Sequence, residues 1–136
     1  MTSAASVREP ALRGAVSANE FIGIFKPRIA VAIMASALAG IAITPGGMPG
    51  ALEVVTLAVG VFLAAGAAGA FNQWAEADLD ALMARTAGRP FASGRLRADT
   101  TWLVGIGALL GLAVGMVALS SNTSAALYTF LGAFTY

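Results

Sequence analysis

Long uncharged runs alternate with short polar segments along the whole chain. Residues 29–43, 54–71 and 102–119 contain no charged side chain, and a fourth uncharged run begins at residue 125. The second and third runs have 18 residues each, within the roughly 17–25 residues that a membrane-spanning helix needs. The first run is lengthened by apolar residues on both sides. The pattern therefore predicts spans at about 25–45, 53–72 and 101–120, and an incomplete fourth span at 125–136.

The composition agrees with an all-α, polytopic transmembrane helix bundle. Of the 136 residues 58% are hydrophobic and 11% are charged, and the mean hydropathy is +0.81. Soluble domains average about 25% charged residues. The alternative, a soluble bundle of buried helices, would have too little polar surface to cover three such runs. The chain has no Cys and no His, which excludes disulfides, thiolate nucleophiles and Ser-His-Asp triads from this stretch.

The basic residues gather in two clusters that one topology brings to the same membrane face. Four precede the first run and four follow the second: Arg8, Arg13, Lys26, Arg28, Arg85, Arg89, Arg95 and Arg97. The segments between the first and second runs and between the third and fourth contain none. By the positive-inside rule, the N-terminus and residues 72–100 lie on the cytoplasmic side. We therefore expect a multi-pass protein of the cell inner (plasma) membrane.

The N-terminal segment has the features of a polar tail followed by the start of a helix, and it lacks those of a signal peptide. No apolar core of 7–15 residues appears before Phe21, so residues 1–16 are expected to form a flexible cytoplasmic tail. Ser17 followed by Glu20 is typical of a capping box. The apolar residues after it predict a short interfacial helix that leads to Lys26.

Glycines recur inside the spans at helical spacing. Gly107, Gly111 and Gly115 are four residues apart, so we expect them to form a packing face of the third span. Gly66 and Gly69 are expected to do the same in the second span.

The candidate chemistry lies in residues 72–96, where the second span emerges at the cytoplasmic face. Asn72, Glu76 and Asp80 are four residues apart, which on a helix places them within about 80° of arc and along about 12 Å. Carboxylate and amide oxygens suit Mg²⁺, which binds through one or two carboxylates plus substrate phosphates. Asp78 falls on another face and is a second-rank candidate.

Arginines follow this polar stripe. Arg85, Arg89, Arg95 and Arg97 carry planar guanidinium groups that match phosphate oxygens. Acids that hold a metal beside arginines form a site for a diphosphate leaving group. The alternative is a solvated cytoplasmic loop whose charges serve topology and solubility.

This segment resembles the first aspartate-rich motif of the intramembrane aromatic prenyltransferases, the UbiA superfamily. The pattern N-x3-[DE]-x3-D, then M-x-R-T-x-x-R-P and S-G-R, is supplied by Asn72, Glu76, Asp80, Met83, Arg85, Thr86, Arg89, Pro90, Ser93, Gly94 and Arg95. Glu76 stands where many members have Asp. The K-P-R sequence from Lys26 to Arg28, together with Met83, points within the superfamily to members whose acceptor is haem.

The resemblance implies a helical membrane enzyme with Mg²⁺ and diphosphate bound at its cytoplasmic face. Asn72, Glu76 and Asp80 would be the metal ligands and catalytic residues, and Arg85, Arg89, Lys26 and Arg28 would bind the diphosphate. The reaction would transfer the farnesyl group of farnesyl diphosphate to a vinyl group of protohaem IX, giving haem O. Haem B would be a substrate and not a prosthetic group. The partners would be the lipid bilayer and the downstream haem A synthesis machinery, with no nucleic acid.

Superfamily members are longer than this chain and carry a second aspartate-rich motif in their other half. We therefore expect the chain to be the N-terminal part of such an enzyme and inactive alone. Two other functions stay open. One is prenyl transfer to another aromatic acceptor, such as a quinone or chlorophyll precursor. The other is a small non-enzymatic membrane protein that assembles through its glycine faces.

Overall fold

The computed structural model describes residues 14–136, and within this range the chain is helical with no strand. The helices are α1 (Ala18–Ile24), α2 (Pro27–Ile43), α3 (Ala51–Ala75), α4 (Ala77–Leu82), α5 (Thr100–Ser120) and α6 (Thr123–Phe134). The predicted all-α membrane bundle is confirmed. Arg8, Arg13 and most of the expected tail at 1–16 lie outside the described residues.

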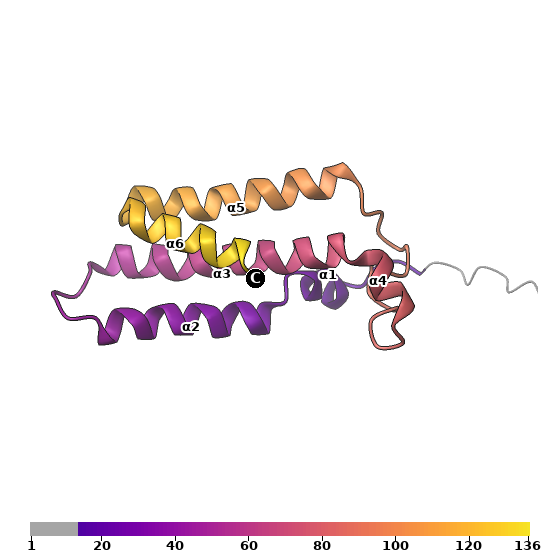
Figure 1. Ribbon diagram of the computed structural model, residues 1–136, viewed down its shortest axis with the longest axis horizontal. Coiled ribbons are helices and arrows are strands. Elements are labelled where there is room, and N and C mark those ends of the chain that lie inside the picture. Colours follow the sequence, from indigo (N-terminus) through magenta and orange to yellow (C-terminus); the bar gives the residue numbers. More distant parts are fainter. Residues whose placement is uncertain (1–13) are drawn as a thin grey trace, which may run out of the picture.

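Helix α3 is the centre of the bundle. It packs against α2 on one side and α5 on the other, and α6 folds back against α3 and α5 (Figure 1). Every residue of α3 from 64 to 70 is buried, and all seven are Ala or Gly. Small side chains let neighbouring helices approach closely. Since helices pack on several sides of α3, its sequence is apolar all round instead of amphipathic.

Within residues 14–136 two helices are long and apolar enough to cross a membrane, α3 with 25 residues and α5 with 21. A third span is present if α1 and α2 count as one span with a bend of 43°. Helix α1 lies where the short helix leading to Lys26 was expected, and α2 lies within the span expected at 25–45. The helical structure breaks at Lys26, and α2 starts at Pro27, whose missing N–H suits the first helical position. The shorter apolar helix α6, with 12 residues, coincides with the incomplete fourth run.

The start of α1 confirms the predicted capping box. Ser17 is the N-cap, its hydroxyl accepts from the Glu20 amide at 3.3 Å, and the Glu20 carboxylate accepts from the Ser17 amide at 2.9 Å. These bonds satisfy amide donors that have no partner inside the helix.

The expected glycine packing is absent from the third span, α5, and present in the second span, α3. A Cβ added at Gly107, Gly111 or Gly115 would meet nothing within 4 Å among the described residues, so this face of α5 is not a packing face here. Helix α5 instead meets α3 at Gly60, where an added Cβ would lie 2.5 Å from Val117 Cγ2. Gly66 and Gly69 do make close contacts, with the bend between α1 and α2.

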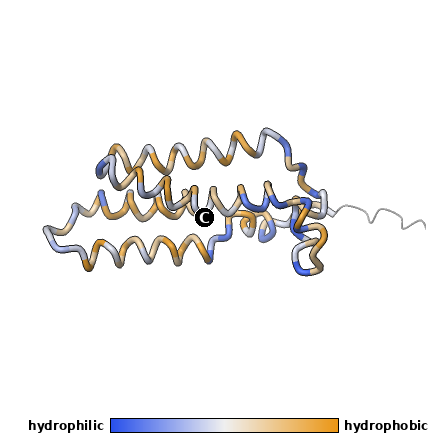
Figure 2. Tube along the Cα trace, in the orientation of Figure 1, coloured by the Kyte–Doolittle hydropathy of each residue, from blue (hydrophilic) through white to orange (hydrophobic). Residues whose placement is uncertain are grey.

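The polar residues of the described chain concentrate at one end of the bundle. Figure 2 shows hydrophilic positions at the end that holds α1, α4 and the segment 83–99, and largely apolar helices elsewhere. The segment 83–99 is anchored by Phe91, which is buried with its ring centroid 5.0 Å from that of Trp102. Trp74 Nε1 also donates to the Asp99 carbonyl at 3.0 Å. The loop is therefore a packed cap on the bundle.

Candidate functional site

The stripe of Asn72, Glu76 and Asp80 crosses a helix boundary. Helix α3 ends at Ala75, Glu76 lies between the two helices, and Asp80 belongs to α4, so the three residues are not on one continuous helix as expected. The helical hydrogen bonds nevertheless continue through the junction. The Glu76 amide donates to the Asn72 carbonyl at 2.9 Å, and the Asp80 amide donates to the Glu76 carbonyl at 2.8 Å. The three residues therefore still follow one another turn by turn.

Their surroundings differ. Asn72 is half-buried and lines an apolar cavity of about 290 Å³ between α3, α5 and α6, whereas Glu76 is exposed. Asp80 is buried, and its Oδ2 accepts a hydrogen bond from Arg89 Nη1 at 2.7 Å. Thr86, also buried, donates its hydroxyl to the Asp80 carbonyl at 2.9 Å. Asp80 is thus fixed in place by residues of the loop that follows α4.

The donor set has the chemistry that Mg²⁺ prefers, two carboxylates and one amide oxygen. Within residues 14–136 no three His, Cys, Asp or Glu side chains gather into a metal-binding group. A metal ion at this junction would therefore depend on the Asn72 amide and on phosphate oxygens of a substrate. The metal role of Asn72, Glu76 and Asp80 stays a prediction.

Beside this junction lies a polar cavity of about 510 Å³. Its lining comes from α1, α2, α3 and the loop after α4: Glu20, Gly23, Lys26, Ile29, Gln73, Arg85, Gly88, Arg89 and Pro90. Lys26 thus lines one space with Arg85 and Arg89, which lie far from it in the sequence. Arg89 is paired with Asp80, but Lys26, Arg85 and Arg89 still outnumber the carboxylates of Glu20 and Asp80, so this space is suited to an anion.

Two further arginines of the described residues lie outside this cavity. Arg28 and Arg97 are exposed and do not line this cavity. Of the four residues expected to bind diphosphate, the structure therefore brings Lys26, Arg85 and Arg89 together and leaves Arg28 apart.

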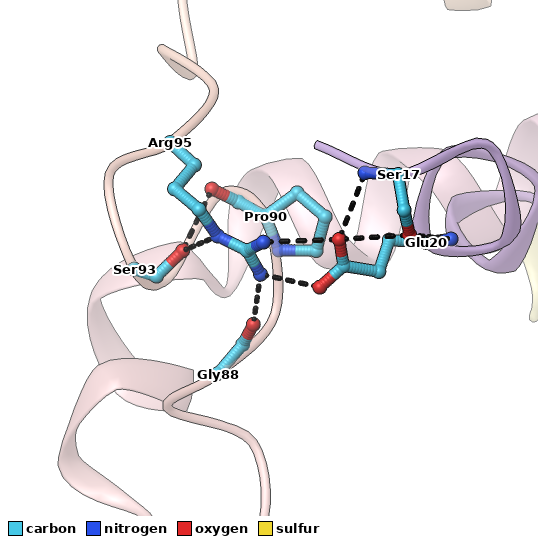
Figure 3. A network of polar contacts seen from close by, with 6 residues as sticks. All are labelled: Ser17, Glu20, Gly88, Pro90, Ser93 and Arg95. Atoms are coloured by element: carbon cyan, nitrogen blue, oxygen red, sulfur yellow. Dashed lines mark hydrogen bonds and ion pairs between the residues drawn. The ribbon is translucent and has the colours of Figure 1, made fainter. Parts of the chain in front are cut away.

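Arg95 holds the loop to helix α1 (Figure 3). Its Nη1 and Nη2 donate to the two carboxylate oxygens of Glu20 at 3.0 and 2.7 Å, and Nη2 also donates to the Gly88 carbonyl at 2.7 Å. Its Nε donates to Ser93 Oγ at 3.1 Å. The hydrogen bonds from Arg95, and then those from Ser17, lower the pKa of Glu20 to about 2. Hydrogen bonding to Glu20 raises the pKa of Arg95.

Two residues of this region were not singled out as site residues in the sequence. Glu20 entered only as a cap, and its second role depends on Arg95, 75 positions away. Gln73 follows Asn72 directly and is 5% exposed, with Nε2 donating to the carbonyls of Gly23 and Ile24 at 3.2 and 3.4 Å. The one available signal was an amide side chain at the polar end of a long apolar helix.

The fold and the site define a polytopic helical membrane protein with a basic cavity at its polar end. A model of the UbiA prenyltransferase family matches residues 33–136, and the chain belongs to this family.

Several curated relatives share a printed name. The chain is 46% identical over 113 residues to protoheme IX farnesyltransferase 2 of Paramagnetospirillum magneticum, covering 83% of this chain and 39% of that protein. It is 37% identical over 129 residues to the protoheme IX farnesyltransferase of Dinoroseobacter shibae, covering 93% and 39%. It is 35% identical over 134 residues to that of Gluconacetobacter diazotrophicus, covering 98% and 41%. The chain thus spans about two fifths of the length of these relatives. No solved structure matches it.

Proposed function

We propose that the whole protein is a Mg²⁺-dependent protoheme IX farnesyltransferase, which transfers farnesyl from farnesyl diphosphate to protohaem IX. The observation that carries the proposal is the cavity where Lys26, Arg85 and Arg89 converge next to Asp80. Its charge suits a diphosphate, and the relatives described above bear the name of this activity. The chain covers only part of those relatives, so the proposal concerns the complete protein.

The basic side chains take the role of diphosphate ligands. Arg89 pairs with Asp80 and also lines the polar cavity, so it connects the proposed metal ligands with the proposed diphosphate site. Arg85 lines the cavity and is exposed, so its guanidinium is accessible to a bound phosphate. Arg28, at the same end, adds positive charge without lining the cavity. Asn72, Glu76 and Asp80 would hold Mg²⁺, which when bound neutralises diphosphate oxygens and makes the diphosphate a better leaving group.

In this proposal an apolar cavity takes the prenyl chain, and its lining meets that of the polar cavity where Tyr136 lies beside Lys26. It measures about 490 Å³ and is lined by side chains of α2, α3 and α6 together with Tyr136. Lys26 Nζ, from the polar cavity, lies 5.4 Å from the centroid of the Tyr136 ring. A substrate with a charged head and an apolar tail matches this change of lining, because the tail is driven out of water and the head is not.

The proposed reaction forms one carbon–carbon bond and breaks one carbon–oxygen bond. The bond between farnesyl C1 and the diphosphate oxygen breaks, and the electron pair leaves with the diphosphate. The terminal vinyl carbon of protohaem IX bonds to C1, and the adjacent carbon takes a hydroxyl from water, which releases a proton. Lys26, Arg85 and Arg89 contribute by stabilising the charge that builds on the departing diphosphate.

We further propose that α1, α4 and the segment 83–99 lie on the cytoplasmic side of the inner membrane. The basic residues at this end and their absence from residues 44–50 support this orientation. The haem O product would then serve the haem A synthesis machinery.

The test is an assay of the protein from its complete reading frame with farnesyl diphosphate and haem B. Haem O, identified by its mass, should form with Mg²⁺ and stop when the metal is chelated. 4-Hydroxybenzoate offered in place of haem should give no prenylated product. Prenylation of 4-hydroxybenzoate, or haem O formation that persists without divalent metal, would contradict the proposal.

A further inference from the structure

Lys26 lies in a backbone conformation that a lysine adopts at a cost. Its φ of 47° and ψ of 56° are left-handed, and it is the one non-glycine residue with positive φ within residues 14–136. The side chain of an L-residue crowds its own backbone in this conformation, which glycine or asparagine tolerates better. Such a residue persists where the surrounding structure imposes it, and these positions cluster at functional sites.

One face of α3 imposes this conformation. A Cβ added at Gly69 would lie 3.3 Å from Lys26 Cδ, and one added at Gly66 would lie 3.7 Å from Phe25 Cβ, so the bend is seated against two glycines. Gln73 is the next residue along this face, since the spacings of three and four residues keep all three positions on one side of a helix. The bend therefore lies in a groove of small residues that ends at a polar side chain.

Gln73 supplies the hydrogen bonds that the bend needs. Helix α1 stops at Ile24, so the carbonyls of its last turn lack part of their helical donors. The Gly23 carbonyl accepts from the Lys26 amide at 3.2 Å, and Gln73 Nε2 donates both to this carbonyl and to that of Ile24. The reverse amide orientation would set an oxygen against two carbonyl oxygens, so the amide orientation is determined. Gln73 Oε1 is buried and has no hydrogen-bond partner among the described residues.

The bend at Lys26 determines the direction of the lysine side chain. Lys26 lines the polar cavity together with Gln73, Arg85 and Arg89, and its Nζ reaches the Tyr136 ring in the apolar cavity. The ammonium group therefore lies where the charged head and the apolar tail of a prenyl diphosphate would meet.

We propose that Gln73 is a positioning residue for the diphosphate subsite. It holds the left-handed bend at Lys26 and so keeps the ammonium group at the junction of the two cavities. The proposal rests on the proposed function, because the role of Lys26 as a diphosphate ligand belongs to it.

The experiment compares Gln73→Met, Lys26→Met and the double variant in the complete protein. The readouts are the KM for farnesyl diphosphate, kcat, the KM for haem, and inhibition by inorganic pyrophosphate. Loss of one charge-assisted contact is expected to raise the pyrophosphate inhibition constant and the KM for farnesyl diphosphate about tenfold in each single variant. The kcat should fall in both single variants as well, because Lys26 also stabilises the charge on the departing diphosphate, whereas the KM for haem should stay within about twofold. The double variant should equal Lys26→Met alone, because Gln73 acts through the lysine.

A matched control removes a different polar contact between helices. Ser120 Oγ donates to Thr56 Oγ1 at 2.6 Å in the part of the bundle away from the polar cavity. Thr56→Val should lower the thermal unfolding midpoint without changing pyrophosphate inhibition. Gln73→Asn keeps the amide on a shorter side chain, so its pyrophosphate inhibition constant should lie between those of the unsubstituted protein and Gln73→Met. If Gln73→Met does not fold, Gln73→Asn takes its place in the comparison.

The outcomes separate the two proposals. If pyrophosphate inhibits the unsubstituted protein and Lys26→Met weakens that inhibition, but neither Gln73 variant does, the role of Gln73 is wrong and the diphosphate site stands. The role is also wrong if the effects of Gln73→Met and Lys26→Met simply add. If pyrophosphate does not inhibit the unsubstituted protein, the proposed function fails and the role of Gln73 fails with it.

Discussion

The guanidinium of Arg95 donates hydrogen bonds to both carboxylate oxygens of Glu20, at 3.0 and 2.7 Å, although the two residues are 75 positions apart in the sequence. The pair connects the loop that follows α4 to the first turn of α1, and Glu20 also lines the polar cavity. A bidentate pair of this kind fixes distance and direction together. The contact therefore sets the position of one wall of the cavity relative to Arg85 and Arg89, which line it from the loop.

Replacing Glu20 by Gln should destabilise the protein in a pH-dependent way. The pKa of Glu20 is lowered from 4.5 to about 2, so its ionised form stabilises the folded state at every pH above about 4.5. This stabilisation is lost as the pH falls through about 2, because the carboxyl is then protonated in both states. The thermal unfolding midpoint of the unsubstituted protein in detergent should exceed that of Glu20→Gln at pH 7, and the two should converge near pH 2. A difference that does not depend on pH would contradict this account.

Asp80→Asn should lower the rate of haem O formation by the complete protein at least about a hundredfold, as expected for a lost metal ligand. It should also lower stability, by about 1–2 kcal/mol after allowing for the partial exposure of Arg89, because that guanidinium loses its partner. Activity and chemical unfolding are measured on the same samples. Activity within twofold of the unsubstituted protein would remove Asp80 from the site.

Arg85→Gln should weaken pyrophosphate inhibition by about three- to tenfold, because the side chain lines the cavity and is accessible to phosphate oxygens. Arg97→Gln is the matched control, since Arg97 is an exposed arginine of the same loop that does not line the cavity. Equal effects of the two substitutions would mean that the loop acts through its net charge alone.

Gly60→Ala should destabilise the bundle by about 1–3 kcal/mol. An added methyl would lie 2.5 Å from Val117 Cγ2 and 3.1 Å from the Ala113 carbonyl, so α5 would have to move away from α3. Gly40→Ala in α2, where an added Cβ meets nothing within 4 Å, is the comparison and should not lower the thermal unfolding midpoint. If both variants unfold alike, close packing at Gly60 is not what holds these helices together.

The proposed orientation can be read by labelling, because the chain has no Cys of its own. In intact cells, a membrane-impermeant maleimide should react with Gly47→Cys and not with Ala98→Cys. Both are exposed positions. They belong to the segment between α2 and α3 and to the segment before α5, which lie at opposite ends of the bundle (Figure 1). Breaking the cells should expose Ala98→Cys to the reagent, and the reverse pattern would invert the topology.

The sequence by itself determined the helical membrane fold and the first turn of α1. Uncharged runs of sufficient length can satisfy their backbone groups in lipid only as helices, so α3 and α5 follow from composition and length. The capping box at Ser17 is a local signal and was predicted, whereas the break at Lys26 and the start of α2 at Pro27 fall inside the span expected at 25–45. The candidate residues Asn72, Glu76 and Asp80 came from spacing, and Lys26, Arg85 and Arg89 from charge and motif.

Only the tertiary structure decided which of these side chains meet. Local spacing treated Asn72, Glu76 and Asp80 as one stripe, but the helix is divided at Glu76 and the carboxylate of Asp80 turns to Arg89. The same limit applies to Gly60, which packs on α5 where the glycine face of α5 itself is open. The convergence of Lys26, Gln73 and Arg89 depends on contacts between segments about 50 residues or more apart. Helical periodicity describes neighbours within one helix, whereas contacts between helices depend on how side chains fit in three dimensions, which no local pattern encodes.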